Sequence, residues 1–479
     1  MTRRIIFSAL FLIFNIYCVS FVLSPALAKE GSSKVIGELP QIKKSDRILI
    51  LAPHPDDEAI ACAGIIQAAK SAGAKIRIVY LTNGDHNEIA FIVYEKRLTL
   101  RKAEFIHMGE LRRKEAIKAM QLLGVAEDSL VFLGYPDFGT FFIFTKFWQD
   151  SRPFRSLLTR ISSVPYKDNP SYGAPYKGES ILEDLKKIIK EFKPNKVFVS
   201  HPADTNPDHK AFYLFLQVAL EDLKNELPRP EVYPYLVHCV GWPLPRHYHP
   251  ELTLMPPEKF LDAQVNWSQY KLSREQLNKK YQAILCYKSQ TQSSAFYLLA
   301  FARQNELFGD YPEINLKINP EKNNETGDVQ GVSFVGDSNI FVDSSMDMLY
   351  GLRNFIQDEG RVSYGLKDNI LYIRLDKAKK INRRFSVLLY LFGYSNKIPF
   401  ARMPKIRIIA RANKVRVFDA RRIIPGHDVS VKLDSNSFII KIPLALLGEP
   451  DFILSFMKGY REFLPVDSIS IRKVNIRRD

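Results

Sequence analysis

Two short stretches of this sequence hold most of its candidate chemistry. The first, "HPDDE" at 54–58, follows an apolar run, and so does the second, "HPADTNPDH" at 201–209. Imidazole and carboxylate groups are ligands that zinc accepts, and a catalytic zinc site keeps three protein ligands and one open position. His54 and Asp57 stand three residues apart across a turn, so both can face one ion, and His209 would complete the set. We therefore predict one metal site built from both stretches.

Asp56 stands between two predicted ligands and must point in another direction. There it can act as a general base toward a water molecule beside the ion. In the second stretch, Asn206 is a suitable N-cap and Pro207 a suitable first-turn residue, which places Asp208 and His209 in the first turn of a helix. Glu58 is expected to be a helix-starting carboxylate and not a ligand.

Other polar residues accompany these loops. His201 and Asp204 precede Asn206, and their role stays open between loop structure and substrate contact. Asp85 ends the "TNGD" stretch at 82–85, which closes another apolar strand. Together with Asp208, these residues are candidates for orienting a ligand or contacting the substrate.

The elements that must position these residues alternate between strand and helix from Asp46 onward. The pattern predicts strands over 46–53, 75–84, 129–137 and 195–200, and helices over 57–72, 111–125, 180–194 and the last part of 195–224. Continuous apolar strands in repeated strand–helix units indicate a Rossmann-like, mostly parallel sheet with helices on both faces. Ligands of such sheets bind beyond the carboxyl ends of the strands, where both His/Asp stretches lie.

Two further segments have a different texture. Residues 137–179 are rich in aromatic side chains and are predicted to form an insertion over the strand ends, either as core packing or as a lid that stacks on sugar rings. After about residue 315, short β-branched and aromatic runs alternate with turn residues, which predicts an antiparallel β-sandwich. The expected domains are a catalytic domain at 46–315 and a β-sandwich at 316–479, with a linker at 29–45.

The motifs resemble those of a known family. "APHPDDEAIACAGII" (52–66) and "HPADTNPDH" look like the two signature motifs of the LmbE/PIG-L-type metal-dependent N-acetylglucosaminide deacetylases, and "FLGYPD" (132–137) is a weaker match. The resemblance covers about residues 46–310. It implies that His54, Asp57 and His209 bind Zn²⁺ or another divalent ion and that Asp56 is the general base. The implied reaction is hydrolysis of an N-acetyl amide on a hexosamine.

The sequence departs from the family at Asn206, where many relatives have a histidine. An asparagine can still donate a hydrogen bond to an oxyanion, but it cannot protonate a leaving amine. The resemblance therefore implies a catalytic part for Asp56 and Asn206, with proton transfer running through Asp56 or through another acid.

Composition limits the partners. The chain has 479 residues and a formal net charge of +16, from 68 basic and 52 acidic side chains. This charge favours anionic partners, but no nucleic-acid-binding signature accompanies it, so no nucleic acid is expected. A glycan or glycolipid substrate is expected, with membrane-surface contact through the aromatic segment as a further prediction.

The N-terminus predicts export. Arg3 and Arg4 precede an apolar run and an A-x-A site ending at Ala28, the pattern of a secretory signal over 1–28, with an uncleaved membrane anchor as the alternative. Cys62, Cys239 and Cys286 lie in apolar contexts beyond it and are expected to be buried thiols. The predicted location is periplasmic or extracellular.

Three functions are consistent with the residues. The leading one is the zinc-dependent de-N-acetylase of a glycan or glycolipid. The others are a catalytically weak, exported glycan-binding protein that uses the β-sandwich, which loosely resembles carbohydrate-binding modules, and an amidase of another N-acylated metabolite.

Overall fold

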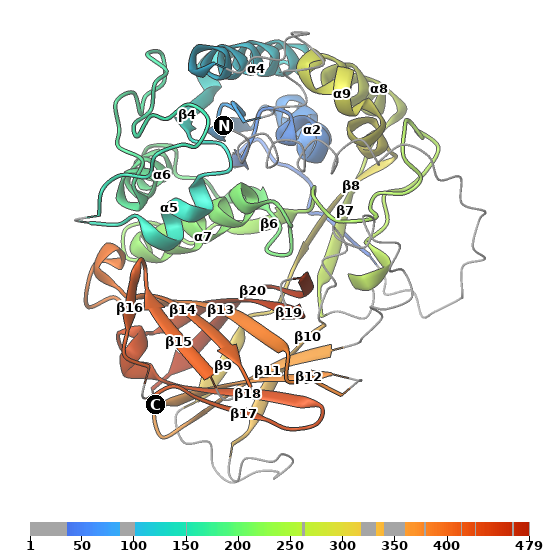
Figure 1. Ribbon diagram of the computed structural model, residues 1–479. Helices are drawn as coiled ribbons and strands as arrows, with labels where there is room; N and C mark the ends of the chain where they lie inside the picture. The colour runs from blue at the N-terminus through green and yellow to red at the C-terminus, as the bar shows by residue number, and fades with distance from the viewer. Residues whose placement is uncertain are drawn as a thin grey trace, which may run out of the picture.

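The computed structural model describes most of the chain as two lobes, an α/β domain and a β-rich domain (Figure 1). The described residues are 36–86, 101–149, 151–260, 264–317, 332–339, 360–377, 380–412, 414–426, 428–461 and 464–478. The predicted signal segment at 1–28 lies outside them. Within them, no helix combines the length and apolar character that crossing a bilayer requires.

The first domain is built on one mixed sheet. Its strands are β1 (Gly37–Glu38), β2 (Arg47–Ala52), β3 (Lys75–Thr82), β4 (Leu130–Tyr135), β5 (Lys196–Ser200), β6 (Glu231–Tyr235), β7 (Asn266–Lys271) and β8 (Asn305–Asp310). Their spatial order is β1-β7-β8-β6-β5-β2-β3-β4. The strands from β6 to β4 in this order are all parallel, and β8 is antiparallel to both of its neighbours. The predicted mostly parallel sheet is confirmed.

Helices cover both faces of this sheet. They are α2 (Asp57–Ala72), α4 (Lys102–Leu122), α5 (Thr140–Lys146), α6 (Gly178–Phe192), α7 (Pro207–Asp222), α8 (Arg274–Leu285) and α9 (Lys288–Leu298). Alternate residues of β2 face opposite cores: Ile48 and Ile50 pack on the α2 side, and Leu49 and Leu51 on the α6 and α7 side. A strand buried on both faces has to be apolar throughout, which explains the unbroken run that precedes His54.

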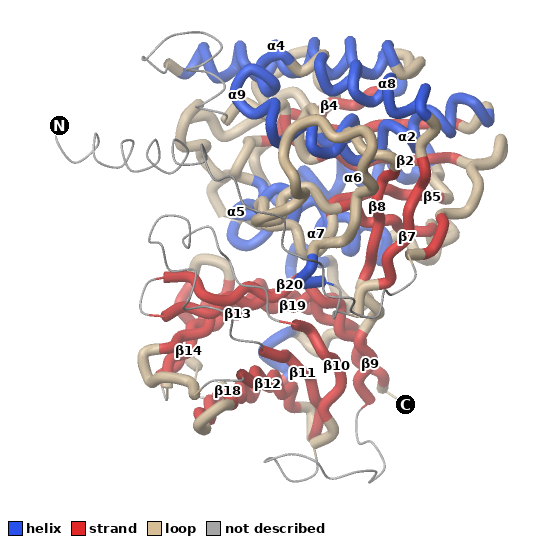
Figure 2. Tube along the Cα trace, turned by 90° about the vertical axis from the view of Figure 1, so that its right-hand side faces the viewer, coloured by secondary structure: helices blue, strands red, loops and turns tan. Residues whose placement is uncertain are grey.

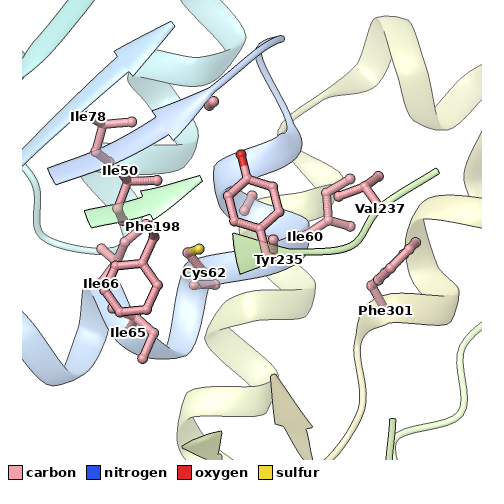
Figure 3. Packing of buried hydrophobic residues seen from close by; sticks show 14 of the residues in the cluster. Ile50, Ile60, Cys62, Ile65, Ile66, Ile78, Phe198, Tyr235, Val237 and Phe301 are labelled. Carbon is pink, nitrogen blue, oxygen red and sulfur yellow. The ribbon is translucent and has the colours of Figure 1, made fainter. Parts of the chain in front are cut away.

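Small side chains let α2 lie close to the sheet. Figure 3 shows Cys62, Ile65 and Ile66 of this helix against Ile50 and Phe198 of the parallel strands. The helix ends at Gly73, whose left-handed backbone (φ 70°) turns the chain into β3.

The cysteine predictions hold for two of three thiols. Cys62 and Cys239 are buried thiols, as expected. Cys286 is only partly buried, because it lies at the end of α8 and not inside the sheet packing.

The described part of the predicted linker, residues 36–45, packs on the first domain. Its strand β1 pairs in parallel with β7, where Gly37 lies opposite Ser268. Ile42 is buried in the adjoining core. Only the preceding residues therefore remain for a linker.

The second domain is a β-sandwich. One sheet has the order β10-β11-β12-β18-β17 and the other β16-β15-β14-β13-β19-β20-β9. The strands are β9 (Ile314–Lys317), β10 (Phe334–Asn339), β11 (Gly360–Lys367), β12 (Ile370–Lys377), β13 (Phe385–Tyr394), β14 (Lys405–Arg411), β15 (Lys414–Asp419), β16 (Arg422–Ile424), β17 (Ser430–Leu433), β18 (Ser437–Pro443), β19 (Phe452–Arg461) and β20 (Leu464–Arg477). Residues of both sheets share one core, and all pairs are antiparallel except β9 with β20. The predicted sandwich is confirmed.

The two domains share a hydrophobic core. Short helix α5 lies between them, together with α7, above the seven-stranded sheet (Figures 1 and 2). The ring of Phe144 in α5 is centred 4.9 Å from Phe215 of α7, 5.0 Å from Phe392 of β13 and 5.7 Å from Phe400. The core-packing interpretation of the aromatic segment therefore holds for Phe144, whereas Phe138 and Phe142 stay 42% and 45% exposed.

Replacing Phe144 should destabilise the whole chain. The substitution Phe144→Ala leaves a cavity where both domains meet, and it is expected to lower the free energy of unfolding by about 3–5 kcal/mol. Phe142→Ala, two residues earlier on the exposed side of α5, is the matched control and should cost far less. Urea unfolding of both variants checks this. Equal effects would mean that the interdomain core does not support α5.

Candidate metal centre

The two sequence stretches meet at the carboxyl edge of the parallel sheet. His54 and Asp57 lie where β2 passes into α2, and His209 lies in the first turn of α7, after β5. Possible ligand atoms of these three residues and of His238 all lie within 4.8 Å of one another. The predicted set is thus assembled in space, although 152 residues separate Asp57 from His209 along the chain.

Asp57 stands between the two imidazoles. Its Oδ2 atom is 3.3 Å from Nδ1 of His54 and 3.1 Å from Nε2 of His209. The backbone N–H of His54 also donates to this oxygen, at 3.0 Å. All three side chains are buried, which keeps competing water away from them.

Each imidazole has its other nitrogen against a carboxylate. Nδ1 of His209 is 3.1 Å from Asp204, and Nε2 of His54 is 3.1 Å from Asp137 and 3.4 Å from Asp208. Histidines that bind a metal almost always donate their second N–H in this way, which fixes the tautomer and the ring orientation. The arrangement fits zinc or another divalent ion held by His54 Nδ1, Asp57 and His209 Nε2.

His54, Asp137 and Asp208 form a second group with metal-compatible spacing. The oxygens of Asp208 are already engaged, because the backbone N–H groups of Phe138 (2.5 Å) and Thr140 (3.1 Å) and the hydroxyl of Thr140 all donate to it. We interpret this group as the support of His54 and not as a separate site. Asp208 thus has the orienting position that the sequence predicted.

Neighbouring opposite charges outweigh burial in setting the pKa values of His209, His54 and Asp57. Burial opposes a charge on His209, but Asp204 and Asp57 outweigh it and raise its pKa to about 9. Burial likewise opposes the charge on His54, yet Asp137, Asp208 and Asp57 raise its pKa well above the usual range. Burial also opposes the charge on Asp57, whose pKa His209 and His54 hold well below its usual range. A divalent cation would take the place of the two imidazolium protons.

Asp56 occupies a strained corner beside the ligands. Its φ of 128° is unusual for a residue with a side chain. Nη2 of Arg112 donates to its carboxylate at 3.2 Å and to the carbonyl of Pro55 at 2.7 Å. Burial raises the pKa of Asp56 to about 7, against the opposing pull of Arg112. Arg112 therefore binds both the side chain and the backbone of this corner.

Glu58 does more than start a helix. It lies in the first turn of α2, as predicted, but it is fully buried. Its Oε2 accepts the backbone N–H of Asp56 at 3.1 Å, and the hydroxyl of Tyr287 donates to its Oε1. Glu58 therefore stabilises the strained backbone at Asp56.

Residues of the second stretch, 201–209, have different structural roles. Asn206 caps α7 as predicted: its Oδ1 accepts the N–H of Asp208 at 2.8 Å, and Pro207 follows at the first helical position. Asp204 accepts the backbone N–H groups of Asn206, Val237 and His238 besides supporting His209. Its role is thus one of positioning.

His201 and Asp85 lie outside the ligand group. The ring of His201 stacks on Trp267 with centroids 5.4 Å apart, and its Nδ1 accepts the N–H of Ala203, so the loop-structure alternative describes it. Asp85 accepts the hydroxyl of Tyr166 at 2.8 Å, and burial together with nearby Asp137 raises its pKa to about 7.

Sequence reasoning missed two contributors. Asp137, at the end of "FLGYPD", was not assigned to the site, although its place after β4 at the same sheet edge was a usable signal. Arg112 lies in the helix predicted over 111–125 and was not assigned to the site, yet it is buried and contacts Asp56. Nothing in the local pattern of a helix with several basic residues distinguishes one that points inward.

The first domain thus combines a mostly parallel α/β sheet with a buried His₂Asp group at its strand ends. Residues 49–220 match the family model described as PIG-L, GlcNAc-PI de-N-acetylase. This match includes both His/Asp stretches and confirms the predicted resemblance for residues 49–220.

Individual relatives share a modest identity with the chain. It is 26% identical over 213 residues to the 1D-myo-inositol 2-acetamido-2-deoxy-alpha-D-glucopyranoside deacetylase of Mycobacterium sp. (strain KMS), an alignment that covers 44% of this chain and 60% of the relative. The protein of the same description from Corynebacterium glutamicum (strain R) is 24% identical, over 34% of this chain and 49% of the relative. The chain thus spans about half to three fifths of these relatives.

Among solved structures, the N,N'-diacetylchitobiose deacetylase from Pyrococcus horikoshii matches with a TM-score of 0.31 and 18% identity, over 51% of this chain and 71% of that one.

Metal binding should release protons. A ligating imidazole must be neutral, whereas the pKa of His209 is about 9 and that of His54 is also raised. At neutral pH, Zn²⁺ binding is therefore expected to displace protons from both rings, and its apparent affinity should rise with pH up to about 9. Isothermal titration calorimetry in buffers of different ionisation enthalpy measures the proton count. An affinity that does not change with pH over this range would exclude these histidines as ligands.

Asp204, whose carboxylate lies 3.1 Å from Nδ1 of His209, should strengthen Zn²⁺ binding. Asp204→Asn removes the negative charge that supports the ring, and we expect the Zn²⁺ affinity to fall by roughly 10- to 100-fold. Asp376→Asn, in strand β12 far from the centre, is the matched control. Competition with a chromophoric chelator gives the affinities, and thermal unfolding of the metal-free proteins shows whether the loop is intact. Equal affinities of both variants would contradict the proposed support.

Proposed function

We propose that the protein is a zinc-dependent de-N-acetylase that hydrolyses the N-acetyl amide of an N-acetylglucosamine-containing glycan or glycolipid. The observation that carries this proposal is the buried group of His54, Asp57 and His209 with Asp56 beside it, within the residues that match the PIG-L family model. The printed descriptions of the relatives, which name deacetylation of acetamido sugars, support the choice of substrate class.

In the proposed reaction, Asp56 transfers the proton, and Arg112 and Glu58 position Asp56. A bound divalent ion would polarise the acetyl carbonyl and make water more acidic. Asp56 accepts a proton from the attacking water as the water oxygen adds to the acetyl carbon. The carbon–nitrogen bond then breaks, and Asp56 returns the proton to the leaving nitrogen, so that the products are acetate and a free amine. Arg112 and Glu58 hold Asp56 in the orientation that this shuttle requires.

The substrate and the location are parts of the same proposal. An exported enzyme would meet cell-envelope glycans, and the N-terminal pattern of basic residues, apolar run and A-x-A site supports export. A positive net charge would favour anionic surfaces there.

The described surface does not favour glycan binding by the β-sandwich. Among the described residues of this domain, no aromatic side chain is exposed, so this surface offers no platform for stacking on a sugar. The domain instead buries Phe392, Phe400 and Phe452 against the catalytic domain.

The decisive test is acetate release from N-acetylglucosamine-containing oligosaccharides by the zinc-loaded protein. Asp56→Asn should lower kcat by roughly 10²- to 10⁴-fold, because it removes the general base, while the bound zinc stays near one ion per chain. Asp376→Asn again serves as control. An inactive wild type over a broad panel of acetylated sugars would refute the proposal, and faster cleavage of longer acyl groups on non-sugar amines would favour the alternative amidase.

A further inference from the structure

His238 approaches the metal centre from a third strand end. It follows β6, and one of its ring nitrogens lies within 4.8 Å of the ligand atoms of His54, Asp57 and His209. Its ring is centred 4.7 Å from that of His209, with the two planes at 80°. His238 belongs to neither of the two His/Asp stretches from which the metal site was predicted.

One carboxylate, that of Asp204, contacts both His238 and His209. Asp204 Oδ2 accepts the backbone N–H of His238 at 2.9 Å and lies 3.1 Å from Nδ1 of His209. The backbone N–H and the hydroxyl of Thr205 donate to the carbonyl of His238, at 3.0 and 3.1 Å. On its other side, the His238 ring stacks on Tyr297. The imidazole is therefore held in place at the centre.

His238 differs from the two ligand histidines in its surroundings. Within the described residues, the ring nitrogens of His238 form no hydrogen bond and no ion pair, whereas each ligand imidazole lies against a carboxylate. Its side chain is half-buried, whereas the three ligands are buried. An imidazole always has at least one ring N–H to donate, so the half-buried ring of His238 can act as a hydrogen-bond donor at the centre.

Asn206 is held at the start of α7. Its Oδ1 is engaged as the N-cap of α7, which ties the side chain to the helix end. His238, by contrast, has a ring nitrogen within 4.8 Å of the ligand atoms of His54, Asp57 and His209.

We propose that His238 donates a hydrogen bond to the carbonyl oxygen of the acyl group that is cleaved, taking the place predicted for Asn206. This inference rests on the proposed function and deepens it. In the reaction, His238 keeps its proton: negative charge develops on the carbonyl oxygen as the water oxygen adds, and the N–H of His238 stabilises that charge until the carbon–nitrogen bond breaks. The same donor would bind one oxygen of the product, acetate.

The test measures acetate binding and metal binding separately from turnover. His238→Phe keeps a ring but removes the donor, His238→Gln restores an N–H donor, and His249→Phe, in the nearby loop, is the matched control. For His238→Phe we expect one zinc ion per chain with unchanged affinity, acetate binding weaker by roughly tenfold, and kcat lower by about 10²- to 10³-fold. His238→Gln should recover part of both losses, and His249→Phe should match the wild type.

Several outcomes would overturn the inference. Loss of zinc from His238→Phe would make His238 a fourth ligand, and unchanged acetate affinity would remove it from the acyl site. A larger loss of acetate affinity in Asn206→Ser, which keeps the helix cap, would return the donor to Asn206. Should His238→Phe fail to fold, His238→Ala is measured instead.

The two proposals can fail separately. Acetate binding that depends on His238, in a protein that cleaves no acetylated sugar, would refute the deacetylase but support this inference. Acetate release that does not depend on His238 would do the reverse.

Discussion

The pairing of each ligand imidazole with a carboxylate behind it is the interaction on which the centre depends. Asp204 behind His209, and Asp137 with Asp208 behind His54, fix which nitrogen of each ring faces Asp57. These carboxylates come from the ends of β4 and β5 and from the start of α7. The ligand geometry is therefore a property of the sheet edge as a whole, since a shift of any of these strand ends would turn a ring.

The corner at Asp56 shows how the fold holds an unfavourable backbone conformation. A residue with this φ costs of order 1–3 kcal/mol, and such a residue persists only where its surroundings determine it. Here Glu58 binds the backbone N–H of Asp56, and Arg112 binds both its carboxylate and the carbonyl of Pro55. Gly84 lies so close to Arg112 that any side chain there would collide with the guanidinium. The result is a carboxylate that is held by Arg112 next to the ligand Asp57 in the chain.

The β-sandwich is connected to this centre through α5. The loop that leads into this helix carries Asp137 and the N–H groups that bind Asp208, and the helix itself packs on β13 through Phe144. Apolar surface on both domains is buried in one cluster, so neither domain has this face exposed to water. The described structure thus gives the second domain a supporting role for the site.

The sequence by itself determined the elements and the chemistry that are encoded locally. The unbroken apolar run before His54 predicted a strand buried on both faces, the Asn206–Pro207 pair predicted the start of a helix, and the spacing of His54 and Asp57 predicted that both could face one ion. Each follows from neighbours along the chain, where backbone geometry relates one side chain to the next.

Only the tertiary structure decided which distant groups support these residues. The sequence shows that Asp137 and His238 follow strands, but only the sheet order β6-β5-β2-β3-β4 brings these strand ends next to His54 and His209. No local pattern reveals that Arg112 of α4 points toward the same corner. The same holds for the aromatic segment, whose local composition fits a lid and a core equally. Its burial was settled by contact with strands more than two hundred residues away along the chain, as between Phe144 and Phe392.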